Sequence, residues 1–462
     1  MIFKRIFLIS TVFSISLWAA IEPDTLSFGP FKTVHVYKGA AVPKHVSLFV
    51  SGDGGWNLGV VDMARELAKN DSWIIGIDIR TYFKNMLVSH GVCAYAAADF
   101  EGLSHFAQKK LGLKEYIVPS LIGYSSGATL VYGVLAQSPQ GTFAGAISLG
   151  FCPDLDVAKP LCKGDGLMSE SRGGKLVGTN LLPATNLKSP WIALQGMRDE
   201  TCLPEPTIEF VKQVPMGEVI TLPKVGHGFG VPANWMPEFL GAFAKMTPPH
   251  AQPSSISQGD LQAPNLPLEE VPAVGVASNT FAILLTGDGG WAGIDRDLAQ
   301  SLAQKGIAVV GWNSLKYLWE RKEQPVASQD LNRVIAYYLS AWKKEKVILL
   351  GYSLGADILP AMAAGLPPEV RTKIESIGLI GVERTYDFEF HITDWVPGKD
   401  DGKPILPELQ KLKGTRILCL YGKEEKGSLC PTLDSSLARA IPFEGGHHFG
   451  GDYNALADAL LH

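Results

Sequence analysis

The sequence predicts an α/β protein built from two tandem units of one architecture, each a mostly parallel sheet flanked by helices. Three observations predict this fold class. The turn Gly-Asp-Gly-Gly-Trp occurs twice, at Gly52–Trp56 and Gly287–Trp291. A Gly-x-Ser-x-Gly turn follows each copy, at Gly123–Gly127 and Gly351–Gly355. Around both pairs, short apolar runs alternate with amphipathic stretches, which is typical of strands and helices that alternate along a parallel sheet.

Each unit can be divided into elements in the same order. An apolar strand leads into the Gly-Asp-Gly-Gly-Trp turn, a helix and a second strand follow, and a third strand runs into the serine turn and its helix. In the first unit these elements are expected at residues 45–50, 61–67, 73–79, 116–122 and 129–136. In the second they are expected at 281–285, 298–304, 307–312, 346–350 and 358–364.

The chain begins with a segment typical of an export signal. Lys4 and Arg5 precede an apolar stretch, Ile6–Trp18, and two alanines at 19 and 20 are suited to cleavage. The stretch is shorter than the roughly 20 residues that span a bilayer. We therefore expect an exported, periplasmic protein, with an uncleaved anchor as the alternative.

A proline-rich stretch without apolar periodicity separates the two units and predicts a linker. The expected organisation is a signal peptide at residues 1–20, an N-terminal domain at 21–246, the linker at 247–272 and a C-terminal domain at 273–462.

Each unit has an even number of cysteines, four in the first and two in the second, as disulfide pairing within each unit requires. Four cysteines permit three connectivities, and a local bridge between Cys152 and Cys162 is one expectation. Cys419 lies in an apolar run, where a buried free thiol is the alternative to a disulfide.

Composition and missing motifs exclude several functions. The net charge is −5 and the chain has no block of Lys or Arg, so we expect no nucleic-acid partner and no strong electrostatic docking to anionic membranes. GxGxxG, Walker A, HExxH and CxxC motifs are missing, so neither a cofactor nor a metal is expected.

The two serine turns propose Ser125 and Ser353 as nucleophiles. A strand that reverses sharply into a helix leaves no room for side chains two residues before and after the serine, and both copies place glycine there. The alternative is a glycine-rich turn with an incidental serine, but the repetition favours α/β-hydrolase ancestry. Either copy could still have lost its activity.

An acid and then a histidine follow each serine, the order that this fold uses. Asp199 follows one apolar strand and Glu425 follows its counterpart, with Glu424 as the neighbouring alternative. His227 and His447 lie in matching glycine-rich segments downstream. We expect each histidine to take the serine proton while its acid fixes the tautomer.

The Gly-Asp-Gly-Gly-Trp turn lies where hydrolases place half of the oxyanion hole. Its candidate N–H donors are those of Asp53 or Gly54 with Ser126, and of Asp288 or Gly289 with Leu354. A plain tight turn, in which the aspartate bonds its own backbone, is the alternative. Because a carboxylate facing an oxyanion would oppose catalysis, we hypothesise that Asp288 instead binds a cationic group of the substrate.

These motifs carry a resemblance to a known family. The second half resembles the VirJ domain, and the whole chain resembles the two-domain AcvB-type members of the AcvB/VirJ bacterial virulence protein family, in the α/β-hydrolase superfamily. The matching stretches are Thr286–Trp291, Ser314–Trp319, Gly351–Ala356, Asp387–Trp395 and Gly445–Phe449, with Gly123–Ala128 and Ser148–Pro153 in the first half.

The resemblance implies a periplasmic serine hydrolase that acts at the membrane surface on aminoacylated phosphatidylglycerol, chiefly the lysyl form, and is linked to virulence and acid tolerance. It carries the nucleophile over to Ser353 and the acid and base to Glu425 and His447. An acidic pocket would suit a lysyl group, and its candidates are Asp288, Glu383, Asp387 and Glu389. The aromatic run Tyr317–Trp319 could touch lipid or pack inside the domain.

Two further interpretations remain open at this stage. The protein could be an exported esterase or peptidase with a soluble substrate. It could also be a non-catalytic scaffold associated with secretion-system proteins, with vestigial triads.

Overall fold

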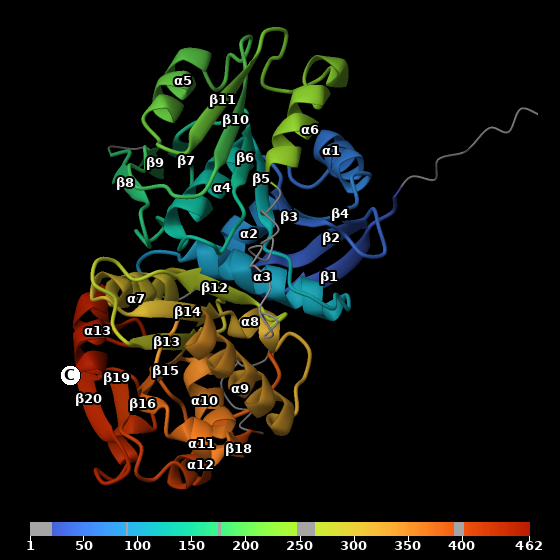
Figure 1. Ribbon diagram of the computed structural model, residues 1–462. Coiled ribbons are helices and arrows are strands. Elements are labelled where there is room, and N and C mark those ends of the chain that lie inside the picture. Colours follow the sequence, from blue (N-terminus) through green and yellow to red (C-terminus); the bar gives the residue numbers. More distant parts are fainter. Residues whose placement is uncertain (1–20, 89–90, 174–176, 247–263, 392–401) are drawn as a thin grey trace, which may run out of the picture.

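The structure, a computed structural model, describes residues 21–88, 91–173, 177–246, 264–391 and 402–462. It consists of two α/β domains that lie against each other (Figure 1). The expected signal peptide, residues 1–20, and residues 247–263 of the expected linker lie outside the described residues. No helix among the described residues is both long and apolar enough to cross a membrane.

The N-terminal domain contains an eight-stranded sheet in the order β1-β2-β4-β3-β5-β6-β10-β11. The six strands from β4 to β11 are parallel, whereas β1 and β2 are antiparallel at one edge. These strands are β1 (Asp24–Phe28), β2 (Lys32–Lys38), β3 (His45–Val50), β4 (Ser72–Ile77), β5 (Ser120–Tyr124), β6 (Ala146–Leu149), β10 (Trp191–Gly196) and β11 (Gly217–Leu222). A separate small sheet holds β7 (Asp154–Leu155), β8 (Met168–Ser171) and β9 (Thr179–Leu182).

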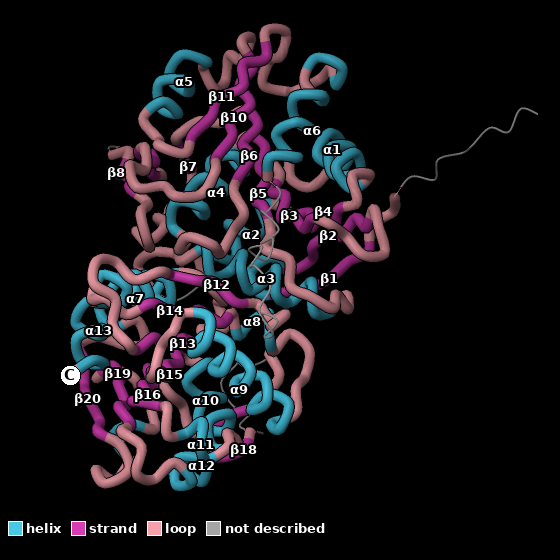
Figure 2. Tube along the Cα trace, in the orientation of Figure 1, coloured by secondary structure: helices cyan, strands magenta, loops and turns pink. Residues whose placement is uncertain are grey.

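Helices cover both faces of this sheet (Figure 2). One face packs against residues of α2, α3, α4 and α5, and the other packs against α1 and α6. The helices are α1 (Leu58–Ala68), α2 (Ile79–Met86), α3 (Ala96–Lys110), α4 (Ser126–Gln137), α5 (Pro204–Lys212) and α6 (Met236–Lys245), with short 3-10 turns η1 (Gly29–Phe31) and η2 (Pro232–Asn234). Burial on both faces explains why the central strands are continuous apolar runs.

The C-terminal domain repeats this plan with a seven-stranded sheet in the order β12-β14-β13-β15-β16-β19-β20. Its strands are β12 (Leu268–Val271), β13 (Thr280–Leu285), β14 (Ala308–Trp312), β15 (Lys346–Tyr352), β16 (Ile374–Ile380), β19 (Ile417–Gly422) and β20 (Arg439–Phe443), with β17 (Thr385–Tyr386) and β18 (Lys403–Pro404) as a separate pair. Its helices are α7 (Gly293–Gln304), α8 (Ser314–Tyr317), α9 (Gln324–Ala341), α10 (Leu354–Ala364), α11 (Pro368–Arg371), α12 (Leu406–Lys411) and α13 (Tyr453–Leu461), with 3-10 turns η4 (Cys430–Thr432) and η5 (Phe449–Gly451).

The two sheets correspond strand by strand. Strands β14-β13-β15-β16-β19-β20 have the order and parallel pairing of β4-β3-β5-β6-β10-β11, and antiparallel β12 stands where β2 stands. Strand β12 lies inside the segment that the sequence assigns to the linker, so the second sheet begins at Leu268 rather than after residue 272. Its four residues are too few to show a periodicity among the surrounding prolines.

Three disulfides correct the expected cysteine pairing. The bonds are Cys93–Cys162, Cys152–Cys202 and Cys419–Cys430. The local Cys152–Cys162 bridge is therefore wrong, because the fold brings each partner next to a cysteine that is distant in sequence. Cys419 is buried, but it is not a free thiol.

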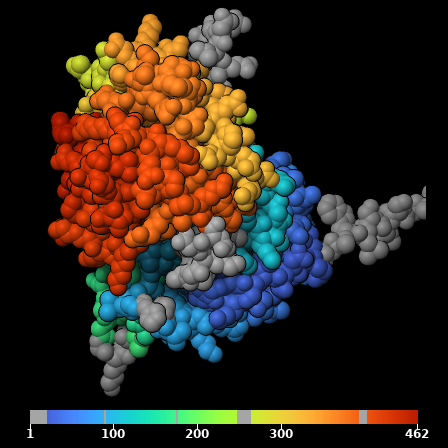
Figure 3. All heavy atoms as spheres, turned by 90° about the horizontal axis from the view of Figure 1, so that it is seen from below, coloured from blue at the N-terminus to red at the C-terminus, as the bar shows by residue number. Residues whose placement is uncertain are grey.

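Helix α3 and the segment that follows it form part of the interface between the domains. Trp319 Nε1 donates a hydrogen bond of 2.7 Å to the carbonyl oxygen of Leu113, and the Trp319 ring packs against Tyr116. Tyr116 belongs to the core of the C-terminal domain, although it precedes β5 of the N-terminal one. Figure 3 shows the two domains in direct contact along this boundary. The lipid-contact interpretation of Tyr317–Trp319 is therefore wrong, since all three residues are buried.

Candidate active site

Ser125 and Ser353 lie at the apex of equivalent turns between a buried strand and a helix. Ser125 joins β5 to α4 with φ 55° and ψ −123°, and Ser353 joins β15 to α10 with φ 51° and ψ −121°. Residues with a Cβ rarely adopt positive φ, so both serines have the strained conformation that exposes the Oγ of a hydrolase nucleophile.

The flanking glycines are required by backbone contacts. A Cβ on Gly127 would lie 2.5 Å from carbonyl oxygens at the end of β3, and one on Gly355 would lie 2.2 Å from a carbonyl oxygen at the end of β13. A Cβ on Gly123 or Gly351 would lie 2.1 or 2.5 Å from the carbonyl oxygen of the glycine four residues later. Backbone atoms cannot move aside, so larger residues at these four positions would open the turn.

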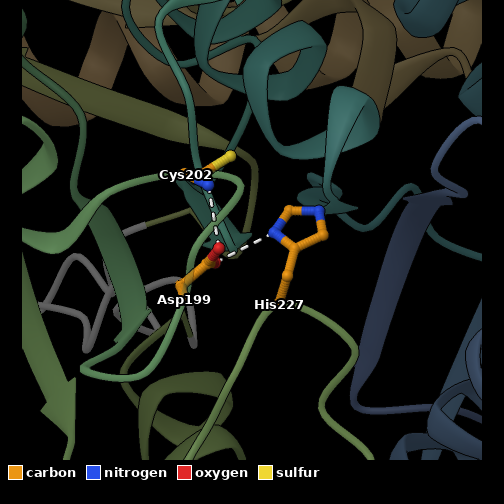
Figure 4. A group of neighbouring side chains, drawn as sticks. All are labelled: Asp199, Cys202 and His227. Atoms are coloured by element: carbon orange, nitrogen blue, oxygen red, sulfur yellow. Dashed lines mark hydrogen bonds and ion pairs between the residues drawn. The ribbon is translucent and has the colours of Figure 1, made fainter.

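In the N-terminal domain the structure brings serine, histidine and acid into one hydrogen-bonded chain. His227 Nε2 lies 2.9 Å from Ser125 Oγ, and its Nδ1 lies 2.9 Å from Asp199 Oδ2 (Figure 4). The other oxygen of Asp199 accepts the backbone N–H groups of Thr201 and Cys202. A carboxylate held in this way keeps the proton on Nδ1, which leaves Nε2 free to accept the proton of Ser125.

In the C-terminal domain the structure brings the histidine and acid together. His447 Nδ1 contacts Glu425 Oε1, and Glu425 Oε2 accepts the backbone N–H of Gly422 at 2.7 Å. Burial alone would raise the pKa of Glu425, but the hydrogen bonds from His447 and Gly422 lower it below its ordinary value. The neighbouring alternative, Glu424, is exposed. Among the described residues, no hydrogen bond joins Ser353 Oγ to His447, whereas Ser125 and His227 of the N-terminal domain do form one.

Two tyrosines that the sequence analysis did not assign also position the histidines. Tyr124 donates its hydroxyl to the carbonyl oxygen of His227 at 3.0 Å, and Tyr352 donates to that of His447 at 3.3 Å. Both directly precede the nucleophile. Their repetition in the two serine turns was the signal that could have revealed them.

Two glycines were not assigned a role from the sequence, although Gly150 lies inside the matching stretch Ser148–Pro153. Gly150 and Gly381 follow β6 and β16, and each has φ of +65°. A Cβ on Gly150 would lie 3.3 Å from the ring of His227, and one on Gly381 would lie 2.7 Å from Cε1 of His447. Glycine at these positions therefore makes room for the histidine rings.

The two Gly-Asp-Gly-Gly-Trp turns lie beside the nucleophiles. A hydrogen bond from Gly55 to Gly52 closes the first turn, and one from Gly290 to Gly287 closes the second. A Cβ on Gly52 would lie 2.9 Å from Cβ of Ser125, and the equivalent distance from Gly287 to Ser353 is 3.4 Å. The expected oxyanion donors are therefore part of a tight turn and also adjacent to the serine.

The aspartates of these turns have different surroundings. In the first domain Asp53 accepts the hydroxyl of Ser126 at 2.7 Å. In the second domain the residue equivalent to Ser126 is Leu354, which has no hydroxyl, and Asp288 lies near the carboxyl group of Glu101.

Of the other three acidic candidates, Asp387 and Glu389 both contact Arg321, each at 3.9 Å. Glu383 is exposed. Asp387 pairs with His391 at 2.8 Å, and Glu389 pairs with Lys109 of the N-terminal domain at 3.2 Å.

Asp199, Cys202 and His227 lie close enough to suggest a metal centre. Cys202 is unsuited to this role because its sulfur is bonded to Cys152. The remaining two side chains are bonded to each other, which fits a catalytic acid and base.

Comparisons with known proteins place this geometry in a family. No curated protein matches the chain. The esterase domain of a Rhodothermus marinus protein is 15% identical, with a TM-score of 0.33 and coverage of 48% of this chain and 98% of that one. An α/β serine hydrolase without lid from Xanthomonas campestris is 18% identical, with a TM-score of 0.33 and coverage of 49% and 93%. Est1E from Butyrivibrio proteoclasticus is 12% identical, with a TM-score of 0.32 and coverage of 42% and 89%.

The family described as "Bacterial virulence protein (VirJ)" matches residues 44–144 and 279–462, which together make up more than half of the chain. The second segment includes Ser353, Glu425 and His447. The chain belongs to the VirJ family of bacterial virulence proteins.

Proposed function

We propose that this protein is an exported serine hydrolase that cleaves the aminoacyl ester of aminoacylated phosphatidylglycerol, with lysyl-phosphatidylglycerol as the principal substrate. The observation that carries the hydrolase assignment is the hydrogen-bonded triad of Ser125, His227 and Asp199. The second domain repeats the acid–histidine contact, between Glu425 and His447, beside Ser353. The family match over residues 279–462, which include Ser353, Glu425 and His447, supports Ser353 as the nucleophile for the lipid.

The reaction would proceed through an acyl-enzyme. Ser353 Oγ attacks the carbonyl carbon of the aminoacyl ester while His447 takes its proton, and the turn at Asp288 with the N–H of Leu354 stabilises the oxyanion. Collapse of the intermediate breaks the bond to the glycerol oxygen, which receives that proton and leaves as phosphatidylglycerol. Water then hydrolyses the acyl-serine and releases the free amino acid.

For Ser353 to act, its hydroxyl and the Nε2 atom of His447 must come into hydrogen-bond contact. Catalytic hydrogen bonds often shorten when substrate binds. Tyr352 and Gly381 limit where the ring of His447 can lie. We propose that bound substrate completes this contact.

Several features support export to the periplasm. The N-terminal segment has the pattern of a signal peptide, and all six cysteines form disulfides, which persist in oxidising compartments. Hydrolysis there would convert a lipid carrying a cationic amino acid back to anionic phosphatidylglycerol, which would account for the proposed link to virulence and acid tolerance.

The test is lysine release from vesicles of lysyl-phosphatidylglycerol by the purified protein, with Ser125→Ala and Ser353→Ala variants alongside. We expect release to survive Ser125→Ala and to vanish with Ser353→Ala. Release that depends on Ser125 instead would move the lipid site to the first domain.

Labelling by a fluorophosphonate probe separates the alternatives. If both serines are labelled but no lysine is released, the protein is a serine esterase or peptidase with another, soluble substrate. If neither serine is labelled, the non-catalytic scaffold is favoured. The fully hydrogen-bonded triad of Ser125, His227 and Asp199 favours a second esterase activity, in the N-terminal domain.

A further inference from the structure

One helix of the N-terminal domain lies across the catalytic edge of the C-terminal one (Figure 1). One side of α3 packs into the core of its own domain through Phe100, Leu103 and Ala107. The other side presents Glu101, His105 and Lys109, which are four residues apart and therefore share a face.

These three side chains meet loops that follow different strands of the second sheet. Glu101 lies at the turn after β13. His105 packs against Phe390, which follows β16, and Lys109 bonds the carbonyl oxygen of Trp319, which follows β14. Substrates of open α/β sheets bind outside these carboxyl ends, where Ser353 also lies. Helix α3 therefore covers part of the catalytic edge of the C-terminal domain.

The carboxyl group of Glu101 reaches the proposed oxyanion turn. Its Oε1 atom lies 3.7 Å from the position of a Cβ on Gly289. Burial, and then the charge of Asp288, raise the pKa of Glu101 to about 8. Within the described part of the chain, the carboxyl group of Glu101 forms no hydrogen bond or ion pair, whereas Lys109 on the same face pairs with Glu389.

A second buried acid lies beside this turn. Asp295 is 3% exposed and accepts a hydrogen bond from the backbone N–H of Gly287. Its Oδ1 atom has no partner among the described residues. Burial and the nearby charge of Asp288 raise its pKa well above the ordinary value. The equivalent residue of the first domain is Val60, so the extra carboxyl group is specific to the Ser353 site.

Glu101 and Asp295 each lie near Asp288, and neighbouring carboxyl groups disfavour one another's ionised forms. A cation placed among them reverses that effect. An α-amino group is one carbon away from the carbonyl that a serine nucleophile attacks. When the carbonyl oxygen occupies the oxyanion turn, this ammonium must therefore lie close to the same turn.

We propose that Glu101 is a specificity-determining residue of the Ser353 site, where its carboxylate receives the α-ammonium group of the acyl part of the substrate. The N-terminal domain thus completes the binding site of the C-terminal one. The inference rests on the proposed function in that it takes the substrate to be an aminoacyl ester.

The test compares two esters that differ by a single ammonium group, the p-nitrophenyl esters of L-norleucine and of hexanoic acid. The full-length protein is used in a Ser125→Ala background, so that only Ser353 contributes. We expect Glu101→Gln to raise KM for the norleucine ester by about tenfold, with kcat and the hexanoate reaction unchanged. Glu101→Asp, which keeps the charge, should restore part of the preference.

Glu238→Gln is the matched control, because Glu238 is an exposed glutamate on α6 of the same domain. Equal losses for both esters in Glu101→Gln would overturn the proposal and leave only a structural role. So would a norleucine reaction that the variant does not alter.

Lysine release from lysyl-phosphatidylglycerol, measured in parallel, separates this proposal from the function. Release that is insensitive to Glu101→Gln would refute the role of Glu101 while the lipid hydrolase stands. No release by the parent protein, with the norleucine preference lost in Glu101→Gln, would refute the lipid substrate while the ammonium site stands.

Discussion

Acidification should weaken the N-terminal domain through one buried histidine at the domain interface. His105 is 2% exposed, and neither ring nitrogen has a hydrogen-bond partner among the described residues. It packs against Tyr116 and Phe390. Burial lowers its pKa from the ordinary 6.5 to about 3, because the charged imidazolium would lose its water without gaining a partner.

The sign and size of the effect follow from proton linkage. Between pH 6.5 and pH 3 the unfolded chain binds a proton at His105 that the folded chain does not. The stability contributed by neutral His105 is therefore complete above pH 6.5 and declines as the pH falls towards 3. The slope is about 1.4 kcal/mol per pH unit, so the loss at pH 5 is about 2 kcal/mol.

The assay is calorimetric unfolding of the wild type and of His105→Leu at pH 7.5 and pH 5. Leucine removes the titrating group and keeps the site apolar. For a domain of this size, about 2 kcal/mol corresponds to a change in Tm of about 4–8 °C. We expect the fall in Tm between the two pH values to be smaller in the variant by that amount.

Carboxyl groups elsewhere also titrate in this range, but they are common to both proteins and cancel in the difference. A His462→Gln variant, which alters an exposed histidine, should retain the full wild-type fall. If His105→Leu and the wild type lose equal stability at pH 5, the histidine is not buried as the structure places it.

Two further changes test the active-site geometry. Gly381→Ala should reduce turnover at Ser353 by at least about tenfold, because its Cβ would lie 2.7 Å from the ring of His447. The control is Gly241→Ala, since nothing lies within 4 Å of a Cβ at that position. Equal activities of the two variants in a chromogenic ester assay would contradict this expectation. Replacing both Cys152 and Cys202 by alanine should lower the free energy of unfolding by about 4 kcal/mol, because the disulfide closes a loop of 50 residues and so restricts the unfolded chain. The measurement is a denaturant titration, and an unchanged midpoint would contradict the expectation.

The repeated motifs predicted the fold class, because the steric demands of the nucleophile turn are local. Glycine at positions −2 and +2 and an apolar strand before them are visible in the sequence, and the structure shows the contacts that require them. The order of serine, acid and histidine also indicated which side chains would meet, since parallel strands place their carboxyl ends at one edge. The sequence pattern was therefore sufficient to predict the residues whose type is required by the nucleophile turn or by the triad.

Long-range features did not leave such a pattern. The partners Cys93 and Cys162 are 69 residues apart, and nothing near either one selects the other. Trp319 is an aromatic residue of the kind found at lipid interfaces, but it is buried because residues of the other domain cover it. Gly150 lies in the stretch Ser148–Pro153, but nothing in that stretch indicates its neighbour His227, which comes from a distant loop. Each case depends on how separate segments pack together.

The two sites need not be equivalent. Both domains have the serine turn, the Gly-Asp-Gly-Gly-Trp turn and the acid–histidine pair. They differ in the charge around the oxyanion turn, where the first has Ser126 and Val60 and the second has Leu354 and Asp295. Glu101 adds to this difference from outside the second domain, because α3 covers the catalytic edge. Packing of the N-terminal domain against the second site therefore adds a carboxyl side chain beside its Gly-Asp-Gly-Gly-Trp turn that the first site does not have, independently of the change of the triad acid from Asp199 to Glu425.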